Sequence, residues 1–304
     1  MKHTIASALG LAILAGISLV TPAMAVISIS WTSIGNAGNP ADPATGYGSV
    51  DHTYNIGTYE VTNAQYVDFL NAKGSSNSAG IYNGTMGSYS NIIQSGSNGS
   101  YSYSVSSTYA NMPVVAVTWF DAARFSNWLG NGQGSGSMET GAYTLNGSTS
   151  GFIAVNAAAG VYIPSENEWY KAAYYNKTSS TYSLYANGLN AITPGDANFA
   201  GSGALNVGYG KASSYGTFGQ GGNAWEWNDS VNGSSRGLRG GAWDDASFSL
   251  TSSPHLNLDP SNEGYVIGFR VASSGLPVSN PIPEPTTAML TILTASGLMI
   301  RRKR

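Results

Sequence analysis

Three widely separated helix-start signals set the main limit on how this chain can fold. Thr62–Gln65 and Ser165–Glu168 are capping boxes, and Thr118–Asp121 is a closely related acidic motif. Between and after these signals lie long stretches rich in Gly, Ser, Asn and Tyr, notably residues 74–107 and 178–222. Such stretches favour turns over regular elements, so the sequence predicts a few short helices in a loop-rich domain.

The strands are expected to be short as well. Runs of β-branched and aromatic residues, bounded by turn residues, predict strands over Tyr54–Val61, Val114–Val117, Gly151–Val155, Leu238–Trp243 and Ile267–Ala272. No fixed repeat period is visible along the chain. With 42% hydrophobic residues, residues 26–275 can bury a sizeable core, and we expect them to form one domain.

The chain contains no cysteine, which excludes several kinds of chemistry. Disulfides, iron–sulfur clusters, thiolate zinc sites and cysteine nucleophiles all require that residue. Only three histidines are present, and His3 lies in a segment that we expect to be removed, so a three-histidine zinc site is excluded too. The formal net charge of −3 shows no basic surplus, so nucleic acid is not an expected partner.

Residues 1–25 have the organisation of a secretory signal peptide. A basic start at Lys2 is followed by an apolar run from Ile5 to Val20 and by a small-residue cleavage site at residues 23–25. A buried N-terminal helix is the alternative, but it does not account for this order of features. The sequence therefore predicts export and processing by signal peptidase.

The C-terminal segment, residues 276–304, has three parts. Pro283-Glu284-Pro285 precedes an apolar run, Thr286–Ile300, and four basic residues close the chain. The run would span only about 22 Å as a helix, against about 30 Å for a membrane core. This tail resembles the PEP-CTERM sorting signal of Gram-negative bacteria. The resemblance implies transient retention in the inner membrane through the C-terminal helix, cleavage by an exosortase, and delivery to the cell surface or extracellular matrix. An ordinary single-pass anchor is the alternative.

Seven segments of the domain, taken together and in order, resemble the formylglycine-generating enzyme family, also called sulfatase-modifying factors. They are Ile56–Tyr66, Met112–Val115, Trp119–Ala123, Ile163–Trp169, Gly222–Trp227, Arg239–Trp243 and Gly268–Arg270. The resemblance covers most of residues 45–275. It implies an α+β fold, a loop-rich single domain related to C-type lectins, with short helices and antiparallel strands.

Many residues of these segments have a structural explanation. Trp225, Trp227 and Trp243 are expected in the core, because burying such rings is strongly favourable. Arg239 and Arg270 lie beside expected strands, where we expect them to pair with buried carboxylates. Helix capping explains the acidic residues in first helical turns, namely Asp121, Glu166 and Glu168.

The catalytic pair of the family is missing from this chain. Formylglycine-generating enzymes use two cysteines, five residues apart and just after an Arg-Gly-Gly segment, to bind copper and oxidise a substrate cysteine. The matching positions hold Asp245 and Leu250, and Ala242 replaces the family's serine. Copper(I) requires soft thiolate ligands, so neither copper binding nor formylglycine synthesis by this mechanism is expected. The fold can be kept without that activity.

Calcium is the metal that the resemblance implies. Family members bind it through the loop that ends in the Gly-Asn-x-Trp-Glu-Trp segment, which nominates the carbonyls of Gly222 and Ala224 and the carboxylate of Glu226. Carbonyl and carboxylate oxygens are the ligands that calcium prefers. A further side-chain ligand of the family falls on Gly219, so one oxygen is missing or comes from a carbonyl. Alternatively, Glu226 only accepts hydrogen bonds from turn amides.

A second calcium site of the family begins at a position that matches Asn198 and Phe199. Its other ligands cannot be placed, because the following loop, residues 200–206, is shorter. The charge of the domain suits a cation in general. The two terminal segments hold five of the 13 basic residues and at most one of the 16 acidic residues, which leaves the domain near −7.

The leading functional hypothesis is an exported, non-catalytic binding module that is stabilised by calcium. Lectin-like folds present variable loops to ligands, so a surface glycan or a protein is the expected partner. Exposed aromatic rings would provide stacking surfaces for it. The candidates are Tyr101, Tyr103, Tyr109, Tyr182 and Tyr185.

Two alternatives belong to other functional classes. An enzyme of unknown reaction would use the acidic loop near Asp244 and Asp245, with Asp259, Glu263 and His255 on the same face. Carboxylates beside a histidine can act as acid and base or hold a hard cation, although such residues also occur in ordinary solvated loops. A structural protein of the extracellular matrix is the other alternative, and it predicts neither a pocket nor a saturable ligand.

Overall fold

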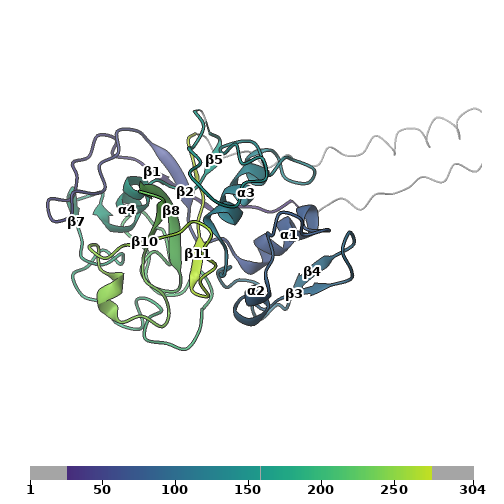
Figure 1. Ribbon diagram of the computed structural model, residues 1–304. Helices are drawn as coiled ribbons and strands as arrows, with labels where there is room; N and C mark the ends of the chain where they lie inside the picture. The colour runs from purple at the N-terminus through teal and green to yellow at the C-terminus, as the bar shows by residue number, and fades with distance from the viewer. Residues whose placement is uncertain (1–25, 158, 276–304) are drawn as a thin grey trace, which may run out of the picture.

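The computed structural model of the chain describes residues 26–157 and 159–275 (Figure 1). The predicted signal peptide, residues 1–25, and the predicted sorting tail, residues 276–304, lie outside the described residues. In the part that the structure describes, short helices and mostly antiparallel strands are joined by long loops, which confirms the α+β class. No helix among these residues is long and apolar enough to cross a membrane.

Three of the helices begin where the sequence predicts them. In each, the N-cap side chain accepts a hydrogen bond from the backbone N–H three residues later, and the side chain at that third position accepts one from the N-cap backbone. These reciprocal bonds satisfy donors that a helix start would otherwise leave free. The helical elements are α1 (Asn63–Lys73), α2 (Gly84–Tyr89), α3 (Trp119–Gly130), α4 (Glu166–Tyr174) and the 3-10 turn η1 (Ser247–Leu250).

The first sheet joins the two ends of the described domain. Its strands are antiparallel and lie in the order β1 (Trp31–Ile34), β2 (Tyr54–Gly57), β12 (Ala272–Ser273) and β5 (Val161–Tyr162). β12, the last strand of the described chain, thus pairs with the early strand β2 on one edge and with β5 on the other. Closing this sheet depends on contacts between segments far apart in the sequence.

The second sheet contains the strand that organises the rest of the molecule. Its order is β10 (Leu256–Leu258), β9 (Ser235–Arg239), β8 (Trp225–Asn232) and β11 (Ile267–Phe269), with β11 parallel to β8. The register places Glu226 of β8 between Arg239 of β9 and Gly268 of β11. Two separate hairpins complete the strands: β3 (Ile92–Ser95) with β4 (Ser102–Val105), and β6 (Tyr175–Asn176) with β7 (Thr181–Tyr182).

Several strand predictions need correction. Val114–Val117 forms no strand, because Ala116 has a φ of 61° that interrupts extended backbone. In Gly151–Val155, only Val155 makes an isolated bridge. No part of β8 is among the predicted strands. The predicted strand Leu238–Trp243 ends at Arg239, because Gly240 and Gly241 have positive φ. The predicted loop over residues 74–107 contains α2 and the β3–β4 hairpin.

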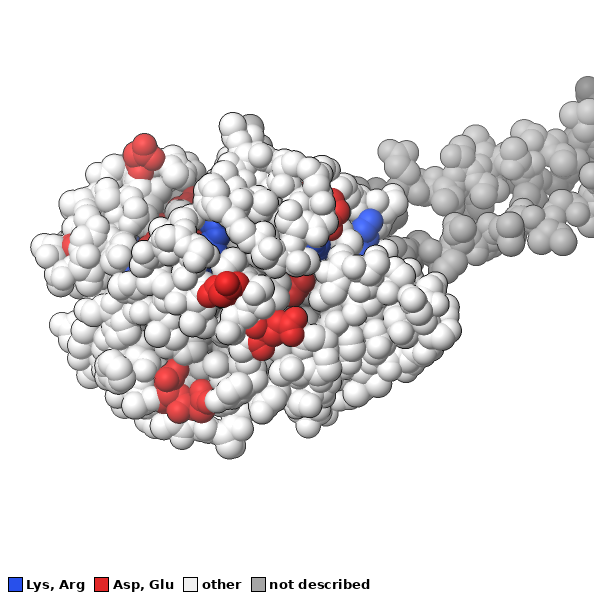
Figure 2. Space-filling view, viewed as in Figure 1, with Lys and Arg blue, Asp and Glu red and all other residues white. Residues whose placement is uncertain are grey.

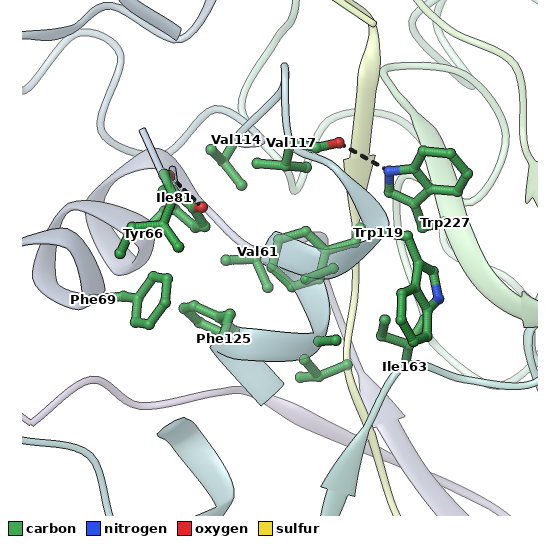
Figure 3. Close-up of a cluster of buried hydrophobic side chains, with 14 of the residues drawn as sticks. Val61, Tyr66, Phe69, Ile81, Val114, Val117, Trp119, Phe125, Ile163 and Trp227 are labelled. Carbon is green, nitrogen blue, oxygen red and sulfur yellow. Dashed lines mark hydrogen bonds between the residues drawn. The ribbon is translucent and has the colours of Figure 1, made fainter. Parts of the chain in front are cut away.

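The main core lies between α1, α3 and the sheet of β8 (Figure 3). Rings from the two helices point toward one another, with the centroids of Phe69 and Phe125 5.6 Å apart. Trp227 is fully buried, and its indole N–H donates to the carbonyl of Val117 at 2.9 Å. Trp225 and Trp243 are buried as well, so all three tryptophans predicted for the core lie there.

We expect Thr118→Ala to lower the free energy of unfolding by about 1 kcal/mol, because the Thr118 hydroxyl accepts from the Asp121 backbone N–H. Urea unfolding measures the change. Ser234→Ala, at an exposed turn position, is the matched control and should leave stability unchanged. Equal stabilities for the two variants would mean that burial alone sets the start of α3.

Candidate functional site

A buried ion pair occupies the middle of the second sheet. Arg270 is fully buried and donates from Nε and Nη2 to the two carboxylate oxygens of Glu226, both at 2.6 Å. Its remaining donors bond to the carbonyls of Gly57 at 3.0 Å and Phe218 at 2.7 Å. The indole N–H of Trp169 on α4 also donates to Glu226, at 2.7 Å. This forked geometry satisfies a charge pair that would otherwise be costly to bury.

A second buried carboxylate lies beside this pair. Glu60 accepts one hydrogen bond, from the Asn223 amide at 2.9 Å, and its other oxygen lies 3.9 Å from Nη2 of Arg270. That oxygen has no hydrogen-bond partner among the described residues. The carboxylate fills the space beside Gly219, where a Cβ would lie 2.2 Å from Oε2. Glu60 therefore occupies space that a side chain at position 219 would need.

Two carboxylates and one guanidinium leave one surplus negative charge in the interior. Burial raises the pKa of the Glu60 carboxyl to about 7, against the opposing effect of Arg270. Near neutral pH, protonation of Glu60 relieves the surplus.

The structure brings the two predicted calcium segments together. The backbone carbonyl of Asn198 accepts a hydrogen bond from the backbone N–H of Asn223 at 2.8 Å. The side-chain amide of Asn198 also donates to Oδ1 of Asn223, at 3.0 Å. Phe199, which follows, is half-buried. The carbonyl of Gly222 accepts from the N–H of Ala224 at 2.9 Å. The segments are thus adjacent, with these carbonyls already hydrogen-bonded.

The carboxylate of Glu226 does not fit the ligand role in this arrangement. Both of its oxygens accept hydrogen bonds from Arg270, and one also accepts from Trp169. It does not accept from turn amides, as the structural alternative proposed, but from two side chains. Calcium binding at Glu226 stays a prediction, and it requires Arg270 or Trp169 to move.

A second buried ion pair ties α4 to β9. Arg239 is fully buried and pairs through Nε with Glu166, and Nη1 donates to the carbonyl of Ser252 at 2.7 Å. Its guanidinium also lies 4.7 Å from the ring centroid of Tyr47. The prediction that both motif arginines pair with buried carboxylates is therefore confirmed.

The positions of the missing cysteines have structural roles. Asp245 accepts from the indole N–H of Trp225 at 2.8 Å and from the backbone N–H of Ala242 at 2.9 Å. Leu250 is fully buried. Neither residue is left facing a reaction site.

The predicted acidic face does not come together as one site. The Asp244 carboxylate accepts from the hydroxyl of Tyr265 at 2.7 Å, whereas the ring of His255 packs near Tyr47, with centroids 6.0 Å apart. Within residues 26–157 and 159–275, no group of three or more His, Asp or Glu could hold a metal ion.

A polar cleft of about 260 Å³ opens where α4, β8 and β10 meet. The side chains of Asn232, His255 and Asn257 line it and make no hydrogen bond with any described residue. We call it the amide cleft; its lining is Tyr47, Glu166, Asn167, Ser230, Val231, Asn232, His255 and Asn257. The sequence gives no sign of it, because the lining comes from four separate segments without a shared motif. Of the predicted stacking tyrosines, none lines this cleft, and Tyr103 is buried.

The buried charge at Glu60 predicts how stability depends on pH. Since its pKa is raised from 4.5 to about 7, the folded state binds more protons between these values, and stability should fall as pH rises through them. Glu60→Gln should remove about 1 kcal/mol per pH unit of this slope. Denaturant unfolding at a series of pH values measures it, with exposed Asp244→Asn as the control. An unchanged slope in Glu60→Gln would contradict the assignment.

Calcium provides a separate test of the same cluster. If Arg270 remains the cation that Glu226 holds, the melting temperature should be the same with calcium and with a chelator. A calcium-dependent rise that is lost in Glu226→Gln would show instead that the cluster rearranges around the ion. Metal content of the purified protein, measured alongside, separates loosely bound from retained calcium.

Comparisons with known proteins place the chain in a family. The model of the sulfatase-modifying factor enzyme 1-like domain matches residues 21–274. Treponema denticola variable protein 1 is similar in structure, with a TM-score of 0.59 and 19% identity over 83% of this chain and 98% of that one. CarF is similar with a TM-score of 0.57 and 22% identity, over 82% and 99%. No curated protein matches the sequence. These two likenesses concern the fold, and the family match decides membership: the chain belongs to the sulfatase-modifying factor enzyme 1-like domain family.

Proposed function

We propose that this protein is a non-catalytic binding module that holds a saccharide in the amide cleft. The observation that carries the proposal is the set of unpartnered polar side chains in that cleft. Asn232 and Asn257 each offer an amide that donates and accepts, and His255 adds a ring nitrogen. Neighbouring hydroxyls of a sugar present the same alternation of donor and acceptor, so such a ligand satisfies these groups together.

The rigid base of the cleft supports binding over chemistry. Glu166 is held by Arg239, and Asn167 accepts from the backbone N–H of Gly48 at 2.9 Å. Tyr47 contributes an aromatic ring to the wall. Because hydrogen bonds already hold Glu166 and Asn167 in place, less conformational entropy is lost when a ligand binds. The absence of cysteine removes the copper chemistry of the family, which agrees with a binding role.

The charge of the surface also favours a neutral, polar ligand. The face shown in Figure 2 is mostly uncharged, with separate acidic groups and few basic ones. The lining of the amide cleft contains no Lys or Arg, so a strongly anionic ligand would meet little positive charge in it. Asp244 and Asp245 line neither the amide cleft nor two small cavities near Gly219 and Tyr59, so the acidic loop gives no support to the enzyme alternative.

The proposal includes export, which rests on the sequence. A signal peptide over residues 1–25 and a PEP-CTERM-like tail over residues 276–304 would send the domain through the inner membrane, with signal peptidase and an exosortase as processing partners. The domain would then work at the cell surface or in the extracellular matrix, where glycans are abundant.

A glycan array followed by calorimetry with the best saccharide tests this function. Asn232→Ala and Asn257→Ala should each weaken binding about tenfold, because each removes hydrogen bonds at the rim. Asn98→Ala, on the exposed β3–β4 turn, is the matched control and should bind as the unchanged protein does. No saturable saccharide, or equal losses in all three variants, would contradict the amide cleft and favour the structural matrix alternative.

A further inference from the structure

A second cleft, on the other side of β8, has a different character from the amide cleft. It has a volume of about 310 Å³ and is bounded by β5, the start of α4, β8 and the loop before β2. Asp229 lines this cleft, whereas its neighbour Ser230 lines the amide cleft, as expected for successive residues of a strand. We call it the Asp229 cleft; its lining is His52, Val155, Asn156, Ala159, Tyr162, Ile163, Ser165, Glu168, Asp229 and Ser274.

One carboxylate oxygen of Asp229 is available to a ligand. Oδ1 accepts from Nη1 of Arg236 at 2.7 Å, while the other oxygen makes no hydrogen bond with any described residue. The side chain is only 12% exposed, so this oxygen has limited access to water. The backbone N–H of Asp229 donates to the carbonyl of Pro164 at 2.9 Å, which fixes the residue in place. The structure thus holds an oriented, half-partnered carboxylate at the polar end of the cleft.

A second carboxylate contributes fixed negative charge. Glu168 accepts from the hydroxyl of Tyr162 at 2.8 Å, from Nε2 of His52 at 3.1 Å, and from the backbone and hydroxyl of Ser165. Nδ1 of His52 is bonded to Asp51 at 2.8 Å. Because each ring nitrogen faces a carboxylate, the pKa of His52 is raised, chiefly by Asp51. Both ring nitrogens of His52 therefore already face a carboxylate and are not free for a ligand.

The charges facing the cleft leave room for a cation and not for an anion. Two carboxylates, Glu168 and Asp229, line the cleft, and the basic groups that pair with them are His52 and Arg236. Both basic groups already hold carboxylates, so an anionic ligand would find no free partner. Arg236 is further fixed by stacking on Trp119, 3.9 Å from the ring centroid.

The remaining walls are apolar and would accommodate a hydrocarbon group. Val155, Ala159 and Ile163 line one side, and the ring of Tyr162 adjoins them. Val155 is 43% exposed, and a ligand seated there would cover it. Removing such surface from water favours binding, while a polar ligand without an apolar part would gain nothing from these walls.

We propose that the Asp229 cleft binds a small organic amine, with its ammonium group on the free oxygen of Asp229 and its apolar body against Val155, Ala159 and Ile163. This second site is independent of the saccharide proposal. Three features carry it together: the volume of the cleft, the carboxylate oxygen of Asp229 that has no hydrogen-bond partner among the described residues, and the apolar walls beside two carboxylates.

Binding at this site is coupled to pH. Burial, together with nearby Glu168, raises the pKa of the Asp229 carboxyl to about 7 against the lowering effect of Arg236. An ammonium ion binds the ionised carboxylate, so binding near neutral pH releases a proton. Affinity should therefore increase between pH 6 and pH 8, while a long-chain amine itself stays charged.

Calorimetric titration of the whole protein with n-hexylamine tests the proposal, with n-hexanol and hexanoate as uncharged and anionic probes of the same length. The amine should bind saturably, with hexanol and hexanoate at least tenfold weaker. In buffers of different ionisation enthalpy, the observed heat should reveal proton release. Equal binding of hexanol would overturn the ammonium assignment, and no saturable amine binding would overturn the site.

Two variants and one control locate the ligand. Asp229→Asn should weaken amine binding about tenfold and remove its pH dependence. Because this change disturbs Arg236, Ala159→Leu provides a second route: it fills the cleft without changing a charge and should also weaken binding. Asp244→Asn removes an exposed acid outside the cleft and should bind as the unchanged protein does. Unchanged binding in both cleft variants would place the amine elsewhere and overturn the proposal.

Discussion

The forked ion pair between Arg270 and Glu226 is the interaction on which the rest of the structure depends. It connects the end of β11 to β8, and through Trp169 it reaches α4. The same guanidinium bonds to carbonyls in two loops, at Gly57 and Phe218. In a domain with short helices and long loops, few backbone hydrogen bonds connect segments that are far apart in the sequence. One fully buried arginine with five N–H donors therefore links segments that no single sheet joins.

The strand β8 contributes residues to the core and to both clefts. Glu226 lies in its fully buried first half, where neighbouring strands cover it on both edges. At the irregularity between Trp227 and Val231 the strand leaves the core, and the successive residues Asp229 and Ser230 within this stretch line different clefts. The ion pair therefore fixes a strand whose outer half lines two clefts of different character.

The sequence predicts the local elements better than the long-range ones. The helix starts at Thr62, Thr118 and Ser165 depend on residues three positions apart, and local hydrogen bonds determine them. The roles of Arg239 and Arg270 as partners of buried carboxylates were also predictable. By contrast, Tyr47 and His255 are far apart in the sequence and meet in the amide cleft only because the whole domain folds. No local sequence pattern predicts that contact. Glu60 beside Gly219 is a similar case. The sequence shows that position 219 has no side chain, but it does not show that the Glu60 carboxylate lies in that space.

This chain has the fold of its family without containing any cysteine. Asp245 accepts two hydrogen bonds that secure the loop after β9, and Leu250 fills a buried position. Both positions contribute to packing, whereas a copper-binding pair would need free thiolates directed at substrate. None of the hydrogen bonds of Arg270 involves either position, so the buried ion pair does not depend on these two residues. We therefore place both proposed binding sites in the clefts beside β8, where several polar and charged groups make no hydrogen bond with any described residue.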